Sequence, residues 1–132
     1  MDIRTIIRGS AIEERDGVLY FSRPPADIVP SRDRTPRDRR TWSFWRKENY
    51  AFLARELAAL APGAALIDVG AGQSDFADLT ARFNACAVDF YPYPGVNVVC
   101  NLEETLPFKD ASADVVLITN LLEHVREPAH VL

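Results

Sequence analysis

The sequence has few cysteines and no cluster of metal-binding side chains. Its 132 residues include two cysteines, Cys86 and Cys100, and two histidines. Without a CxxC pair or a His-rich spacing, the chain lacks both the disulfide framework of a small secreted domain and the signature of a metal site. Because both cysteines lie in apolar, strand-like surroundings, we expect two buried, reduced thiols.

Long apolar runs are also missing. No stretch approaches the roughly 18 consecutive apolar residues that a membrane-spanning helix requires. Residues 1–10, MDIRTIIRGS, lack the apolar core of a signal peptide and carry an acid at position two. Because 48% of the residues are apolar, the chain can still build a core. The sequence therefore predicts a cytoplasmic protein without a membrane span.

The net charge of −4 is unevenly distributed along the chain. Residues 1–50 carry 11 basic against 8 acidic residues, whereas residues 51–132 carry 4 basic against 11 acidic residues. The acidic part would repel a polyanion, which argues against nucleic acid as a partner. The arginine-rich run over residues 32–40 leaves RNA or phosphate contact by a basic arm as an alternative, but no aromatic residue is interleaved in it.

Residues 1–22 predict a small β hairpin. Asp16-Gly17 lies between two strand-like segments, Ser10–Glu14 and Val18–Ser22, and Asp-Gly in this position favours a tight turn. An isolated hairpin is only marginally stable, so we expect it to pack against the rest of the chain.

Residues 23–40 have the composition of a linker, because four prolines interrupt any regular element and charged residues dominate. The main domain is expected over residues 41–132. Its first segment, residues 41–60, predicts a helix that ends at Ala61-Pro62-Gly63. This helix carries three aromatic residues that could cover a ligand, although core packing is the simpler role for at least one tryptophan: Trp42, Trp45 and Tyr50.

From Ala64 onward, short apolar segments alternate with helical ones. Strands are predicted over residues 64–69, 85–89, 97–100 and 114–119, and helices over residues 74–83 and from residue 127. The last strand is almost wholly apolar, as expected for a strand buried on both faces. This alternation predicts an α/β fold with a Rossmann-like, doubly wound and mainly parallel sheet.

The first of these strands ends in a glycine loop, Asp68-Val69-Gly70-Ala71-Gly72. Its two glycines allow a sharp turn and a close approach to a ligand, and free N–H groups at the start of the next helix favour an anionic group. Asp89 ends the second strand, where a carboxylate can bind a ribose diol. A dinucleotide fingerprint would require glycine at position 75, where this sequence has Asp75. The carboxylate of Asp68, just before the loop, suits a ligand with a positive amino group.

Two further blocks make a family resemblance specific. Residues 106–116 read LPFKDASADVV, and residues 121–125 read LLEHV, followed by Pro128. Together with residues 66–72 and 87–90, these blocks resemble the class I methyltransferases, in particular the methyltransferase type 11 family, over about residues 64–132. The resemblance implies S-adenosylmethionine as cofactor and methyl transfer to a small-molecule or glycan-related acceptor.

The resemblance also implies which residues hold the cofactor. The methionine part would be held by the end of the first strand and its loop, namely Asp68, Gly70, Ala71 and Gly72. The ribose would bind Asp89, and the adenine would be held by Phe90, Asn101 and Leu102. The backbone carbonyl of Asn120 would face the methionine amino group.

Two positions depart from the family pattern. Ser74 replaces the third glycine of the loop, which is tolerable at a negative φ. Asn101 stands where the family usually has Asp, and a neutral amide oxygen makes a weaker hydrogen bond than a carboxylate does. Both changes are compatible with binding.

The candidate general base is His124, which lies near the expected position of the methyl group. The alternative is a histidine that only hydrogen-bonds locally at the start of a helix. Glu123 is a second candidate, with capping as its alternative role.

The family's sheet has seven strands, and this sequence supplies four of them before Leu132. The fourth strand would then form an open apolar edge. Three expectations stay open. The chain is a fragment of a longer enzyme, or its sheet is completed by a second copy or a partner chain, or it is a truncated, catalytically inactive fold that acts as a binding or interaction module.

Overall fold

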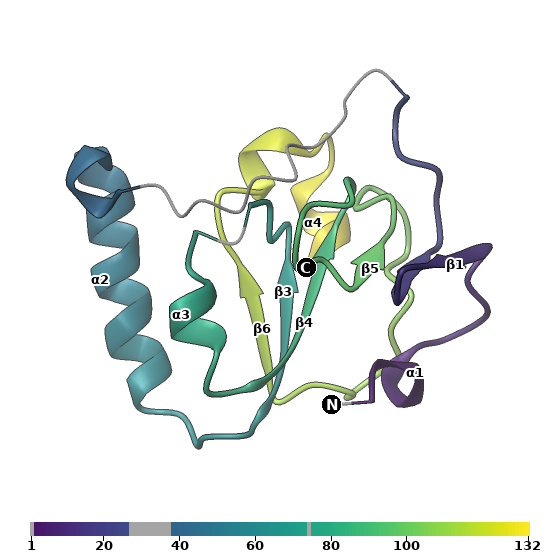
Figure 1. Cartoon of the computed structure of the whole chain (residues 1–132), viewed down its shortest axis with the longest axis horizontal. Helices are drawn as coiled ribbons and strands as arrows, with labels where there is room; N and C mark the ends of the chain where they lie inside the picture. Colours follow the sequence, from purple (N-terminus) through teal and green to yellow (C-terminus); the bar gives the residue numbers. More distant parts are fainter. Residues whose placement is uncertain (1, 27–37, 74) are drawn as a thin grey trace.

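A computed structural model of the chain describes residues 2–26, 38–73 and 75–132. A six-stranded sheet in the order β1-β2-β5-β4-β3-β6 forms its centre (Figure 1). Every neighbouring pair is parallel except β1 with β2. The predicted α/β fold with a mainly parallel, Rossmann-like sheet is therefore confirmed. The strands are β1 (Glu13–Arg15), β2 (Val18–Tyr20), β3 (Ala65–Val69), β4 (Asn84–Asp89), β5 (Val98–Val99) and β6 (Val115–Ile118).

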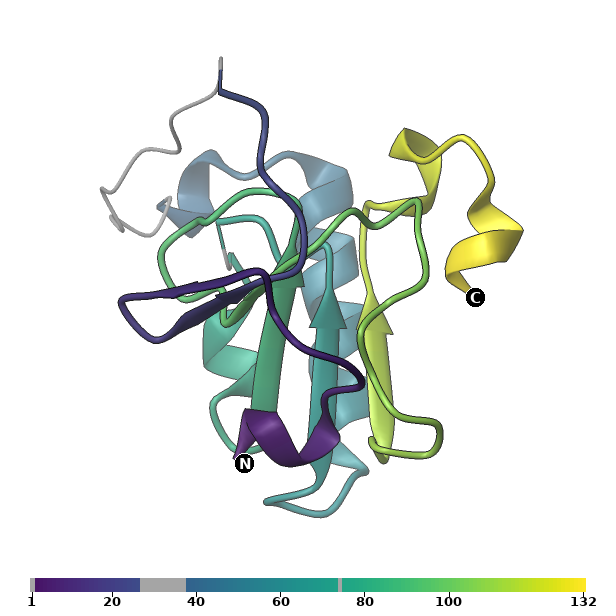
Figure 2. The ribbon, with the colours of Figure 1, turned by 90° about the vertical axis from the view of Figure 1, so that its right-hand side faces the viewer.

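Helices cover both faces of this sheet. The longest, α2 (Phe44–Ala58), lies with α3 (Ala77–Thr80) on one face, and α1 (Ile3–Ile6) lies on the other, as Figure 2 shows. Two 3₁₀ helices and a terminal helix complete the described elements: η1 (Arg39–Thr41), η2 (Leu122–His124) and α4 (Pro128–Val131). Among the described residues, no helix has the length and apolar content needed to cross a membrane.

The core consists of two main layers, because successive residues of a strand point to opposite faces of the sheet. Leu66 of β3 packs with Leu53 and Leu57 of α2 in one layer. Ile67, the next residue, packs in the other layer with Ile6 at the end of α1. The sheet is thereby fixed between α2 on one side and the N-terminal segment on the other.

The N-terminal hairpin belongs to the same sheet. Its strands β1 and β2 are joined at Asp16 and Gly17, whose φ angles of 51° and 78° fit the tight turn that the sequence predicts. Strand β2 then pairs in parallel with β5, with Leu19 opposite Val98. The hairpin therefore gains its stability by extending the sheet.

Two expectations about local structure were wrong. Within residues 75–83 the expected helix is only the single turn α3, because Phe76 before it has φ −109° and ψ 16° without a side-chain cap, and the bond from Phe83 N to Thr80 O tightens the turn after it. Strand β6 is not buried on both faces, because it ends the sheet and leaves Val116 57% exposed.

Both cysteines are free and buried, as expected. Burial is the main cause that raises the pKa of each thiol to about 12. The linker expected over residues 23–40 falls in large part outside the described residues, since residues 27–37 are not described. The proposed basic arm over residues 32–40 therefore lies mostly outside them as well.

Candidate functional site

Two acidic residues lie at the carboxyl ends of neighbouring parallel strands. Asp68 of β3 is paired in register with Ala87 of β4, and Ala87 precedes Asp89 by two residues. Residues two apart share a face, so Asp68 and Asp89 point to the same side of the sheet. Strand β3 has β4 on one side and β6 on the other, and in such sheets ligands bind where the strand order reverses.

The glycine loop wraps over the end of β4. Gly70 and Gly72 have φ angles of +75° and +54°, in the region that residues with side chains rarely adopt. The N–H groups of Gly70 and Ala71 both donate to Val88 O, at 2.9 and 3.1 Å, and Gly72 N donates to Asp89 Oδ2 at 2.8 Å. The loop amides are therefore bonded to β4 and do not point at an anionic group, as a pyrophosphate-binding loop would require.

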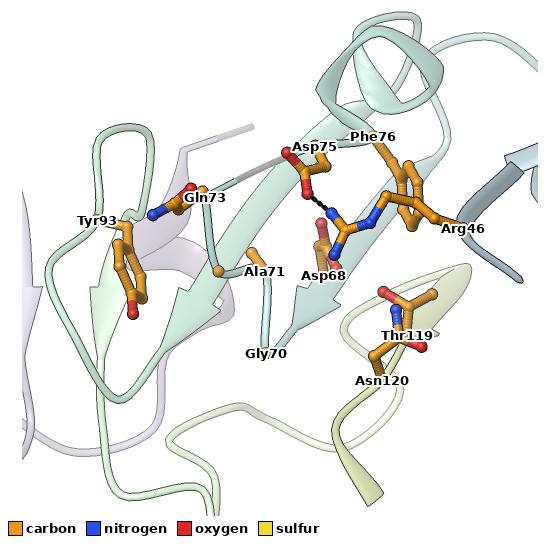
Figure 3. Close-up of a pocket in the computed structure, with 11 residues that line it drawn as sticks. Arg46, Asp68, Gly70, Ala71, Gln73, Asp75, Phe76, Tyr93, Thr119 and Asn120 are labelled. Atoms are coloured by element: carbon orange, nitrogen blue, oxygen red, sulfur yellow. Dashed lines mark ion pairs between the residues drawn. The ribbon is translucent and has the colours of Figure 1, made fainter. Parts of the chain in front are cut away.

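Two hollows open beside this loop and share some of their lining. The first, of about 290 Å³, lies over Asp68 and is also lined by Thr119 at the end of β6 (Figure 3). The second, of about 540 Å³, lies over Asp89. Four residues line both hollows, namely Gly70, Gly72, Tyr93 and Asn120. The two hollows therefore adjoin and can take one elongated ligand.

The structure brings the nine residues expected to bind the cofactor, and His124, to these hollows. The first is lined by Asp68, Gly70, Ala71, Gly72 and Asn120. The second repeats three of these and adds Asp89, Phe90, Asn101, Leu102 and His124. Ser74, the departure from the family loop, lies outside the described residues.

Asp68 carries an unsatisfied acceptor. Its Oδ1 is buried, and no donor among the described residues makes a hydrogen bond to it. Burial, and then the negative charge of Asp89, raise the pKa of the Asp68 carboxyl to about 6. A buried carboxylate without a donor is costly, so a cationic donor entering the first hollow would stabilise it.

Unlike Asp68, Asp89 has hydrogen-bond donors for both of its carboxylate oxygens. Its side chain accepts hydrogen bonds from Gly72 N through Oδ2 and from Tyr91 N through Oδ1, the latter at 3.0 Å. Burial raises the pKa of this carboxyl, while these backbone donors act in the opposite direction. Each carboxylate oxygen can accept a second bond, so Asp89 can still bind hydroxyl groups from the second hollow.

Asn120 turns the chain after β6. Its φ of +51° places it in the left-handed region, which Asn tolerates better than most residues. Its Oδ1 accepts a hydrogen bond from Asn49 Nδ2 of α2 at 3.3 Å. The side chain is thereby tied to α2, at a position that lines both hollows.

Comparison with known families decides what this site belongs to. Residues 54–132, more than half of the chain, match the methyltransferase domain of the type 11 family. The chain belongs to this family of class I methyltransferases. Methyltransferases of this family use S-adenosylmethionine. Neither the search of curated proteins nor the search of solved structures returned a match.

His124 of this methyltransferase lies in η2, and its side chain is exposed along the second hollow. Its backbone N donates to Leu121 O at 2.8 Å, which fixes the turn that carries the ring. Glu123 is also exposed but lines neither hollow. Of the two candidate bases, the structure therefore brings only His124 to the site.

Asn101 is engaged in a local turn. Its Nδ2 donates to Glu104 Oε1 at 2.8 Å, and its Oδ1 accepts from Glu103 N at 3.1 Å. The amide oxygen has one lone pair left for an adenine amino group.

Some residues of the site were not found in the sequence. The first hollow is also lined by Arg46, Gln73, Asp75, Phe76, Tyr93 and Thr119. Thr119 could have been inferred, since it precedes Asn120 at a strand end. Nothing in the sequence pattern indicates Arg46, because only the packing of α2 brings it to the loop.

The aromatic residues before and on α2 have different roles. Trp42 is buried and stacks edge-on against Phe76 with ring centroids 5.8 Å apart, which confirms the expectation that one tryptophan packs in the core. Trp45 is 74% exposed. Tyr50 donates through its hydroxyl to Asp78 Oδ2 of α3 at 2.6 Å. These contacts attach α2 to the segment that follows the glycine loop.

Proposed function

We propose that this domain binds S-adenosylmethionine along the two adjoining hollows and transfers its methyl group to a small-molecule or glycan-related acceptor. The observation that carries the proposal is the pair of carboxylates, Asp68 and Asp89, on either side of the glycine loop. Asp68 has an acceptor for a cationic group, and Asp89 has acceptors for a diol. S-adenosylmethionine presents both groups, joined through a sulfonium centre.

In this proposal each part of the cofactor has partners of matching chemistry. The methionine ammonium binds Asp68 and the backbone at Asn120 in the first hollow. The ribose hydroxyls bind Asp89, and the adenine lies against Phe90 and Leu102 in the second. Gly70, Ala71 and Gly72 present no bulky side chain between these parts, so the ligand can follow the loop closely.

When bound, the cofactor supplies an activated methyl group, and the remaining work is positioning and proton removal. The exposed ring of His124 at the second hollow is the group we assign to accept a proton from the acceptor. A histidine is suited to this step because a neutral imidazole nitrogen can accept a proton and release it to solvent. The proposed acceptor therefore carries a hydroxyl or amine proton.

The experiment is a transfer assay with a panel of small-molecule and glycan-related acceptors, in which S-adenosylhomocysteine is measured by mass spectrometry. The proposal is supported if S-adenosylhomocysteine forms with one acceptor class and its rate of formation falls at least about tenfold in His124→Gln. His130→Gln is the matched control, because His130 is exposed in α4 and lines neither hollow. Equal rates in His124→Gln and the wild type would remove His124 from the mechanism.

The second candidate is a fold that acts only through protein contacts. The observation in its favour is the exposed Val116 on the edge strand β6, beside an apolar hollow of about 420 Å³. This candidate predicts no S-adenosylhomocysteine with any acceptor and no binding of S-adenosylmethionine.

A further inference from the structure

Arg46 places a positive charge at the first hollow. It lies in the first turn of α2, before the segment that matches the family, and its side chain is 30% exposed. In Figure 3 the guanidinium extends from α2 into the hollow, between Asp75 and Asp68, and forms an ion pair with Asp75. Arg46 is thus part of the wall of the hollow.

The position of this guanidinium is set by the docking of α2. At the start of the helix, Ser43 Oγ accepts a hydrogen bond from Arg46 N at 3.3 Å. One turn later, Asn49 is bonded to Asn120 and Tyr50 to Asp78. Since these contacts tie α2 to both β6 and α3, Arg46 is held over the hollow.

The charges of the hollow match a zwitterion. Of the described residues that line it, three are charged: Asp68, Asp75 and Arg46. An amino-acid group needs an acceptor for its ammonium and a donor for its carboxylate. Asp68 supplies the acceptor, but the N–H groups of the glycine loop already donate to Val88 O and Asp89. The donor therefore comes from a side chain of the hollow, and among the described residues that line it Arg46 alone is cationic, whereas Gln73, Tyr93 and Thr119 offer neutral donors.

A guanidinium has five N–H donors in a planar fork, so an ion pair with Asp75 leaves donors for a second carboxylate. We infer that Arg46 is a cofactor-binding residue that holds the carboxylate of the methionine part of S-adenosylmethionine, while it keeps its contact with Asp75. The inference rests on the proposed function, because it adds one contact to the same site.

The test compares S-adenosylmethionine with its decarboxylated form, which keeps the sulfonium and the ammonium. Calorimetry on the wild-type chain is expected to show about 10- to 100-fold weaker binding of the decarboxylated form, the range for a charged hydrogen bond. In Arg46→Met, the binding of S-adenosylmethionine should weaken by a similar factor, and the preference for the carboxylated form should disappear. Lys47→Met removes the same charge from an exposed neighbouring position and should keep the preference.

If Arg46→Met keeps the wild-type preference, or weakens the binding of both ligands by the same factor, the inference is overturned and the proposed function is left intact. A wild-type chain that binds neither ligand overturns both. If Arg46→Met does not fold, Arg46→Lys is decisive: a reduced preference supports the carboxylate contact, because an ammonium lacks the planar fork, and an unchanged preference contradicts it.

Discussion

Asp89 Oδ2 accepts a hydrogen bond from Gly72 N at 2.8 Å, so the carboxylate that ends β4 fixes the loop that follows β3. The two features of the sequence that most strongly indicate a nucleoside-type ligand are therefore one structural unit. The same carboxylate bonds Tyr91 N and orients the chain that leads to the second hollow.

This bond predicts that Asp89 stabilises the fold before any ligand binds. Asp89→Ala leaves Gly72 N and Tyr91 N without their acceptors, which should lower the free energy of unfolding by about 1–3 kcal/mol. Asp89→Asn keeps one acceptor and should lose less than Asp89→Ala. Urea denaturation measures both, with the exposed Asp110→Ala as control, and equal stability of all three variants would contradict the role of Asp89.

Gly70 of the loop should tolerate a side chain less well than Gly63, which lies before β3. A Cβ at Gly70 would lie 3.1 Å from Leu121 side-chain atoms, in addition to the strain of its positive φ. Gly63 has a similar φ of +80° but open space around it, which makes Gly63→Ala a matched control for backbone strain alone. Gly70→Ala should therefore destabilise the chain by about 1 kcal/mol more than Gly63→Ala, as judged by urea denaturation.

Asp68 should make the ligand-free protein less stable as the pH rises. Its pKa is raised from an ordinary 3.8 to about 6, so between these values the folded chain holds a proton that the unfolded chain has released. Stability should then fall from about pH 4 to pH 6, by up to about 3 kcal/mol at 1.4 kcal/mol per pKa unit.

Asp68→Asn should remove this pH dependence and be more stable than the wild type at pH 7. Thermal unfolding across pH 4–8 measures the effect. Asp89, whose pKa is also raised by burial, remains in the variant and keeps its own contribution to the pH dependence. A variant that is less stable than the wild type at pH 7 would show that ionised Asp68 is not a cost to the fold.

The affinity for S-adenosylmethionine should have the opposite pH dependence. The ammonium binds the ionised form of Asp68, so affinity should rise with pH through about 6 and level off above it. In Asp68→Asn the affinity should be lower at pH 7.5 and nearly constant from pH 5 to 8. Calorimetry over this range tests the assignment, and a wild-type affinity that does not vary with pH would contradict it.

Features local in sequence were predicted well. Asp68 and Asp89 follow apolar segments directly, and the carboxyl ends of parallel strands meet at one edge, so both acids could be placed in one site. The turn at Asp16-Gly17 was predictable for the same reason, since two adjacent residues determine it.

Features that depend on tertiary packing were not predicted from the sequence. Arg46 reaches the loop only because Trp42 and Tyr50 dock α2 on α3, and no local pattern reports such a contact. The edge position of β6 was expected from the strand order of the family, but its apolar sequence resembles that of a strand buried on both faces and does not indicate that Val116 is exposed. The length of α3 was overestimated because the apolar pattern does not report the non-helical backbone dihedrals of Phe76.

The central claim is that Asp68, Asp89 and the loop between them bind S-adenosylmethionine. Titration calorimetry of the wild-type chain with S-adenosylmethionine, repeated on Asp89→Asn and Asp110→Asn, tests it most directly. The account predicts a dissociation constant below about 1 mM, at least about tenfold weaker binding in Asp89→Asn, and no change in Asp110→Asn. No heat with the wild type, or equal affinity in Asp89→Asn, would contradict it.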